Sequence, residues 1–172
     1  MSNNYHIHVF IGLYVNGQEV ALPPALGAVR PTLDANGDFL GNGSDFFPCL
    51  YELHTHDLTG VVHVESQNAG ISEPVPSDSK FMLGQFYAVW GATLSWGQFE
   101  GSPGQVGPYS GPMEIYTSGP TAQTGTTTAE STLQPYSGDP TQIPLYSHEV
   151  IWFLIGPTYP SRLPGVSFDE QY

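Results

Sequence analysis

Residues 5–22, YHIHVFIGLYVNGQEVAL, predict the fold more strongly than any other stretch of this chain. The segment before Asn16 is rich in β-branched and aromatic residues, which favour strands. The pair Asn16-Gly17 is typical of a two-residue hairpin turn, and Pro23-Pro24 ends the returning strand. We therefore expect a β-hairpin with one apolar face. The side chains on that face are Ile7, Val9, Ile11, Leu13 and Val15.

A second hairpin is predicted in residues 49–66, where CLYELHTH and VVHVES flank the turn Asp57-Leu58-Thr59-Gly60. If Asp57 lies opposite Gly60, then His54 lies directly opposite His63, and Glu52 lies opposite Glu65. Opposed residues share a face of the sheet, with their Cβ atoms about 5 Å apart. The inference depends on the turn, because a slip of one residue would move every downstream side chain to the other face.

The remainder of the chain predicts one helix and a long irregular region. Residues 80–90 place Met82, Phe86 and Trp90 near helical spacing, with Ser77 or Ser79 as N-cap and Gly91 as the stop. Residues 97–142 are dominated by Gly, Pro, Ser and Thr, and we expect a long loop region with one short strand at 113–117. The segment 148–156, HEVIWFLIG, is apolar almost throughout and predicts a strand in the middle of a sheet.

These elements together predict a mostly β fold, formed by a single domain over residues 1–172. A β-sandwich or a β-grasp-like sheet with one short helix near 80–90 fits them best.

The charge composition excludes several partners. The chain has 172 residues and a net charge of −13, with 16 acidic residues against Arg30, Lys80 and Arg162. Three cations cannot follow a phosphate backbone, so a nucleic-acid partner is excluded. No run of about 18 apolar residues exists, so we expect no membrane span.

Five of the six histidines fall in the two predicted hairpins. Residues two apart in a strand share a face, so His6 and His8 point the same way, as do His54 and His56. With His63 opposite His54, three imidazoles gather on one face of the second hairpin. The bland alternative is that each is an ordinary strand or turn residue, but two H-x-H pairs and an opposed histidine argue against it.

Imidazole nitrogen is a ligand for Zn(II) and Cu(II), and three histidines leave one coordination position open. We predict a site made by His54, His56 and His63, joined by His6 and His8 if the two hairpins are neighbours. Glu65 or Asp57 would bind the ion directly or orient an imidazole through a hydrogen bond. We expect His148 to be structural, and Cys49 to be a buried, inert thiol.

A second, weaker cation pattern lies in residues 34–45. Asp34, Asn36, Asp38, Asn42 and Asp45 follow the spacing of a calcium loop, in which oxygen ligands bind Ca²⁺. Phe39 stands where such a loop requires Gly, and position 12 is Asp instead of Glu. A solvated turn is therefore the favoured interpretation.

The blocks HIHVFIGLYVNGQEVALP, LHTHDLTGVVHVES and MLGQFYAVWG resemble those of a family of small, uncharacterised prokaryotic proteins that are often exported. The resemblance covers residues 5–95 and extends to residues 137–145. It implies that the histidines act as a unit and implies no reaction.

The leading functional prediction is an extracellular or cell-surface protein that binds Zn or Cu in a structural or binding role. The scarcity of Lys and the abundance of Tyr, Gly and Thr also favour a homo-oligomer or a self-associating assembly. Two other classes stay open. One is a mononuclear metal enzyme, either an oxidoreductase or a hydrolase, and the other is a calcium-dependent surface- or sugar-binding module. The absence of a visible signal peptide keeps a cytoplasmic location as the alternative.

Overall fold

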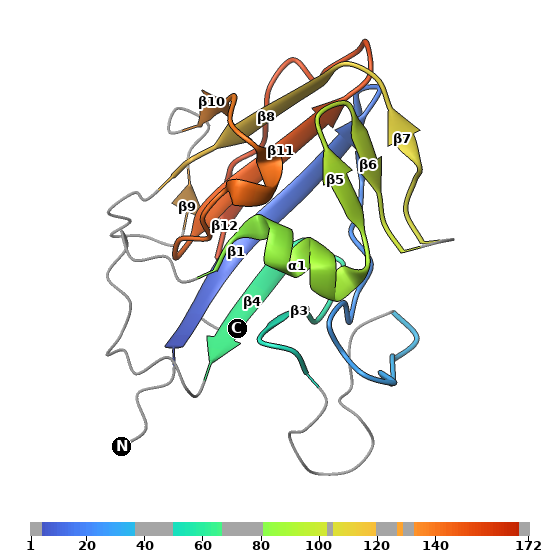
Figure 1. Cartoon of the computed structure of the whole chain (residues 1–172), viewed down its shortest axis with the longest axis vertical. Helices are drawn as coiled ribbons and strands as arrows, with labels where there is room; N and C mark the ends of the chain where they lie inside the picture. The colour runs from blue at the N-terminus through green and yellow to red at the C-terminus, as the bar shows by residue number, and fades with distance from the viewer. Residues whose placement is uncertain are drawn as a thin grey trace.

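A computed structural model describes residues 5–36, 50–66, 81–102, 105–119, 127–128 and 133–168. Its main sheet runs in the order β10-β8-β11-β1-β4-β3, with β2 also paired to β1 (Figure 1). The strands of this sheet are β1 (Tyr5–Val15), β2 (Gln18–Val20), β3 (Leu53–Thr55), β4 (Val61–Ser66), β8 (Met113–Thr117), β10 (Gln134–Tyr136) and β11 (Glu149–Ile155). The smaller sheets contain β5 (Thr93–Ser95), β6 (Gln98–Glu100) and β7 (Tyr109–Ser110) in one, and β9 (Thr127–Thr128) and β12 (Val166–Ser167) in the other.

Strand β1 is the centre of the molecule. It pairs antiparallel with β2 and β4 and parallel with β11, so the two predicted hairpins are direct neighbours. The predicted turn at Asn16-Gly17 is confirmed, because both residues have positive φ angles of 51° and 79°. The apolar strand β11 lies between β1 and β8 and is fully buried, as its composition predicts.

The two faces of the sheet are both covered. Helix α1 (Leu83–Trp90) lies across β1 and β4 on one face (Figure 1). The odd-numbered side chains of β1 belong to the core cluster on this face, together with Leu83, Phe86 and Tyr87 of the helix. Even-numbered residues of β1 face the other way, where Phe10 joins Trp152 and the C-terminal segment in a second cluster. The predicted apolar face is thus the larger core.

Helix α1 begins and ends for local reasons. Gly91 ends it in the left-handed conformation (φ 71°), as predicted. The predicted serine N-caps are replaced by Met82, whose backbone N–H donates to the side chain of Gln85 at 2.7 Å. Ser77 and Ser79 lie outside the described residues.

The described part of residues 97–142 contains more strands than its composition indicates. The strand at Met113–Thr117 is confirmed, but β6, β7 and β10 and a 3₁₀ turn at Pro140–Gln142 also lie there. Strand β10 extends the main sheet beyond β8, which explains why a polar segment such as Gln134–Tyr136 is strand. Paired backbone groups and the partner strand, instead of side-chain pattern, decide its conformation.

Where the structure describes the chain, the fold is therefore mostly β with one short α-helix, as predicted. Across the described ranges, α1 is far too short to cross a bilayer, and no helix there is a candidate span.

Candidate metal centre

A row of histidines crosses three neighbouring strands. His63 in β4 lies directly opposite His54 in β3 and directly opposite His8 in β1. The register predicted for the second hairpin is therefore confirmed, and the pairing of β1 with β4 adds His8 to the row. Neighbouring strands are about 4.8 Å apart, so the row brings its imidazoles within reach of one another.

His63 and His54 also form a set with His56, and the ligand atoms of these three histidines all lie within 4.8 Å of one another. Their rings are nearly parallel, with interplanar angles between 8° and 20°. His54 Nε2 and His56 Nε2 are only 3.1 Å apart. Two nitrogens bound tetrahedrally to one zinc ion at 2.0–2.1 Å would be about 3.3–3.4 Å apart. The His54–His56 pair is thus close to the spacing that a shared ion requires.

The ring of His54 is oriented by the backbone. Its Nδ1 lies 2.8 Å from the carbonyl oxygen of Tyr51, which can only accept, so Nδ1 carries the proton. In the neutral ring the lone pair is then on Nε2, which accepts a hydrogen bond from His56 Nε2–H at 3.1 Å. A metal-binding histidine that donates its other N–H to a backbone carbonyl is a recurring arrangement in metal sites.

His63 completes this set from the neighbouring strand, but its ring is stacked. It lies nearly parallel to His56, at 8° and 4.2 Å between ring centroids. Because an imidazole lone pair lies in the plane of its ring, His63 must rotate about its side-chain bonds to share an ion with His54 and His56.

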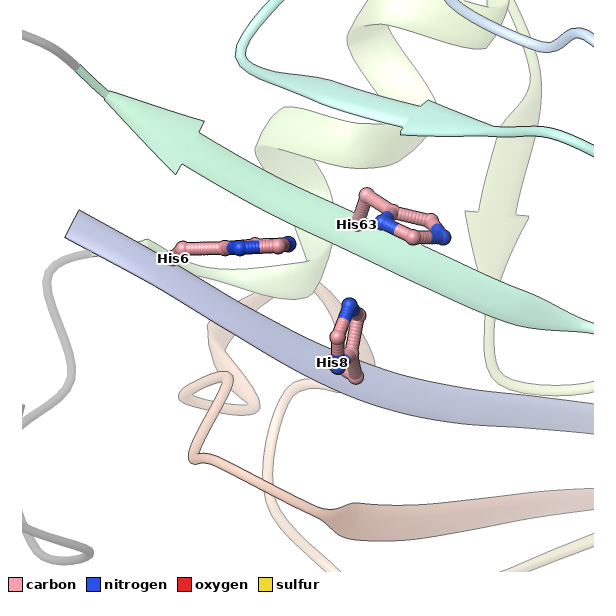
Figure 2. A group of neighbouring side chains, drawn as sticks. All are labelled: His6, His8 and His63. Carbon is pink, nitrogen blue, oxygen red and sulfur yellow. The ribbon is translucent and has the colours of Figure 1, made fainter. Parts of the chain in front are cut away.

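A second set comprises His6, His8 and His63, whose ligand atoms also all lie within 4.8 Å of one another. Figure 2 shows His6 and His8 rising from β1 beside His63 on β4. The ring of His8 stands nearly perpendicular to those of His6 and His63, each 4.6 Å away. Its Nε2 is buried without a hydrogen-bond partner, which is costly for a polar atom and is relieved by a bound cation.

The two carboxylates expected beside the cluster differ in their surroundings. Glu65 lies opposite His6, and its Oε1 is 3.2 Å from His6 Nε2 and 3.8 Å from His63 Nδ1. Asp57 instead stabilises the turn, since its Oδ1 accepts hydrogen bonds from the backbone N–H and the hydroxyl of Thr59. Glu65 is therefore the carboxylate placed to assist a metal.

Burial keeps the central imidazoles neutral. Desolvation, reinforced by the neighbouring histidines, lowers the pKa of His8 to about 4 and that of His63 to about 2. Desolvation also lowers the pKa of His54 and of His56, and the negative charges of Glu65 and Asp57 partly offset this for His56. Neutral imidazole is the form that binds a metal, so the cluster is ready to bind at neutral pH.

His148 lies beside the cluster, although it belongs to neither set. Its backbone N–H donates to the carbonyl of His8 at 2.7 Å, and its ring centroid is 6.5 Å from that of His8 and 4.8 Å from that of Phe168. Its place next to β1 follows from the parallel pairing of β11 with β1. Sequence reasoning also missed the Tyr51 carbonyl, since every residue offers such a group and no side-chain pattern marks it.

The other predicted cation positions are only partly described. The carboxylate of Asp34 accepts hydrogen bonds from the backbone N–H and the side-chain amide of Asn36, at 2.7 and 3.3 Å, which is ordinary turn chemistry. Asp38, Asn42, Asp45 and Cys49 lie outside the described residues. The calcium loop stays a prediction.

No family model, no curated protein and no solved structure matches this chain. The functional argument therefore rests on the geometry of the histidines.

Proposed function

We propose that this protein binds a transition-metal ion, Zn(II) or Cu(II), through His54, His56 and His63. The observation that carries the proposal is the 3.1 Å approach of His54 Nε2 to His56 Nε2, with the opposite nitrogen of His54 held by the Tyr51 carbonyl. In the metal-free chain these two nitrogens share a hydrogen bond, and a cation between them would replace the proton that His56 Nε2 donates.

The role that the geometry supports best is structural. Strand β3 has only three residues and lies at the edge of the sheet, where β4 is its one strand partner among the described residues. An ion held by His54 and His56 from this segment and by His63 from β4 would tie the edge to the rest of the sheet. The binding energy of such an ion adds to the stability of the folded chain.

Catalysis is the competing function, and one observation favours it. The side chains of His6 and Glu65 are 42% and 40% exposed, while His54 and His63 are only 1% and 3% exposed. The cluster is thus buried on the β3 side and open to solvent on the β1 side. A three-histidine ion with an open position there would bind water, and Glu65 would move the proton.

The setting we propose is extracellular, with the protein as a subunit of a self-associating assembly. The support is compositional: charged residues make up 11% of the chain, and only three are Lys or Arg. Surfaces built from Tyr, Thr and Gly pack together without burying unpaired ammonium groups.

Metal binding tests the proposal. Purified protein freed of metal should take up zinc or copper, measured by elemental analysis and by competition with a coloured chelator. His54→Ala and His56→Ala should each lose an ion or bind it about a hundredfold more weakly. His148→Ala is the matched control, because it removes a neighbouring imidazole outside both sets, and it should bind as the unaltered chain does. A wild-type chain that takes up neither metal would refute the proposal.

A further inference from the structure

His63 belongs to both sets of converging histidines. It is the residue that the set His54, His56 and His63 shares with the set His6, His8 and His63. The sharing follows from the sheet, because β4 lies between β3 and β1, and His63 has a histidine opposite it on each side. The imidazole of His63 is therefore a possible ligand in both sets.

The two nitrogens of His63 lie on different sides of its ring. Nδ1 is the nitrogen 3.8 Å from Glu65 Oε1, and the same carboxylate oxygen is 3.2 Å from His6 Nε2. Figure 2 shows one ring nitrogen of His63 on the side of His6 and the other at the far end of the ring, away from His6. One imidazole cannot direct both nitrogens at a single ion, since their lone pairs diverge. Once it has rotated out of its stack with His56, it can bind a different ion with each.

From this arrangement we propose that the cluster holds two transition-metal ions bridged by His63, an inference that rests on the proposed function. The first ion is bound by His54, His56 and one nitrogen of His63. The second is bound by His6, His8 and the other nitrogen of His63, with Glu65 beside it. Each ion has three protein nitrogens and one position for water or for an outside ligand.

The second set has its own evidence for a ligand. His8 Nε2 is buried without a hydrogen-bond partner, a state that native proteins rarely tolerate. Its ring stands edge-on to both His6 and His63, at 75° and 82°. His8 can therefore direct its lone pair between the other two rings. His6 and His63 are nearly parallel to each other, at 26° and 5.9 Å between ring centroids, and must rotate to share an ion with it.

The bridge has a defined proton balance. A neutral His63 carries one N–H proton and one lone pair, so the first ion binds the nitrogen that has the lone pair. When the second ion binds, it replaces the remaining ring proton, which leaves for the solvent. The first cation lowers the pKa of the remaining N–H, as bound metals do for other ligands, so the second cation replaces that proton more readily.

The test is a titration of the metal-free full chain with Cu(II), followed by elemental analysis and electron paramagnetic resonance. We expect two ions per chain and a loss of the ordinary Cu(II) signal, because two Cu(II) ions joined through one imidazole couple magnetically. His6→Ala, which removes a side chain that is 42% exposed, and His56→Ala should each reduce the ratio to one ion per chain and restore the signal. His148→Ala should keep two coupled ions.

The alternative results separate the two proposals. One tightly bound ion in the wild-type chain would overturn the bridged pair while leaving the proposed function intact. If the wild-type chain binds two ions that give full, uncoupled Cu(II) signals, and His63→Gln still binds both, then His63 does not join them. No bound ion in the wild-type chain would overturn both. The magnetic measurement on the wild-type chain requires no substitution, so the result does not depend on a variant that folds.

Discussion

Gly12 and Trp152 lie directly opposite each other on the two central strands. The Trp152 side chain is fully buried, and it lies over Gly12 so closely that a Cβ there would be 2.1 Å from a ring carbon. The missing side chain of Gly12 is thus what allows a tryptophan on the histidine-bearing face of the sheet. Trp152 in turn anchors the second hydrophobic cluster.

Gly12→Ala should therefore destabilise the protein by about 1–3 kcal/mol or more, because the added methyl group overlaps a buried ring. Urea unfolding measures the change. The double variant Gly12→Ala with Trp152→Phe should cost less than the sum of the two single changes, since the smaller ring leaves room. Additive losses would show that the contact is not the cause.

The strand on which His63 lies determines which other histidines it can contact. The same histidine on β3 would contact only β3 and β4, whereas on β4 it contacts histidines of both neighbours. The two-ion proposal is possible only at that position.

At the scale of elements, β3 is held by a loop as well as by β4. The backbone N–H of Leu26 donates to the Thr55 hydroxyl at 3.0 Å, and the hydroxyl donates to the carbonyl of Pro23 at 3.1 Å. The Thr55 N–H also donates to the carbonyl of Leu26 at 3.0 Å. Thr55 is fully buried, on the opposite face from His54 and His56, and so it anchors the segment that carries both.

Thr55→Val keeps the shape of the side chain but removes the hydroxyl. It should cost about 1–3 kcal/mol, because the Leu26 N–H and the Pro23 carbonyl lose a buried partner. Chemical unfolding of the metal-free chain measures the loss, and Thr93→Val, at an exposed strand position, serves as the matched control. Equal effects at the two positions would contradict the proposed role of Thr55.

At the scale of the whole molecule, two kinds of buried ionisable group make stability depend on pH in opposite directions. Burial raises the pKa of Glu149 to about 8, so its proton is held in the folded chain and released near 4.5 in the unfolded one. The contribution of Glu149 to the free energy of unfolding is lost as the pH rises from about 4.5 to about 8. His8 takes up a proton near 6.5 when unfolded but only near 4 when folded. The contribution of His8 to the free energy of unfolding is lost as the pH falls from about 6.5 to about 4.

Glu149→Gln should abolish the fall in stability between pH 6.5 and 8 and leave the fall below pH 6.5 in place. The glutamine keeps an oxygen for the Tyr146 N–H, which donates to Glu149 at 3.1 Å, but carries no charge to bury. Urea unfolding in the presence of a chelator, from pH 5 to 8.5, measures the fall in stability on both sides of pH 6.5. Glu100→Gln, which removes an exposed carboxylate, is the matched control. If the stability of Glu149→Gln still falls between pH 6.5 and 8, a group other than Glu149 causes that fall.

Local signals predicted much of this fold. The Asn16-Gly17 turn, the register that places His54 opposite His63, the helix stop at Gly91 and the buried strand β11 all follow from residues a few positions apart. Such features depend on backbone sterics, on turn geometry and on the alternation of side chains along a strand, and short stretches of sequence carry all three.

Tertiary structure alone decided which strands are neighbours. The pairing of β4 with β1 brings His6 and His8 to His63, and the parallel pairing of β11 with β1 brings His148 beside His8. The Tyr51 carbonyl and the strands within residues 97–142 likewise depend on distant partners. Pairing between distant strands depends on how all the apolar faces pack together, so no short stretch of residues contains it.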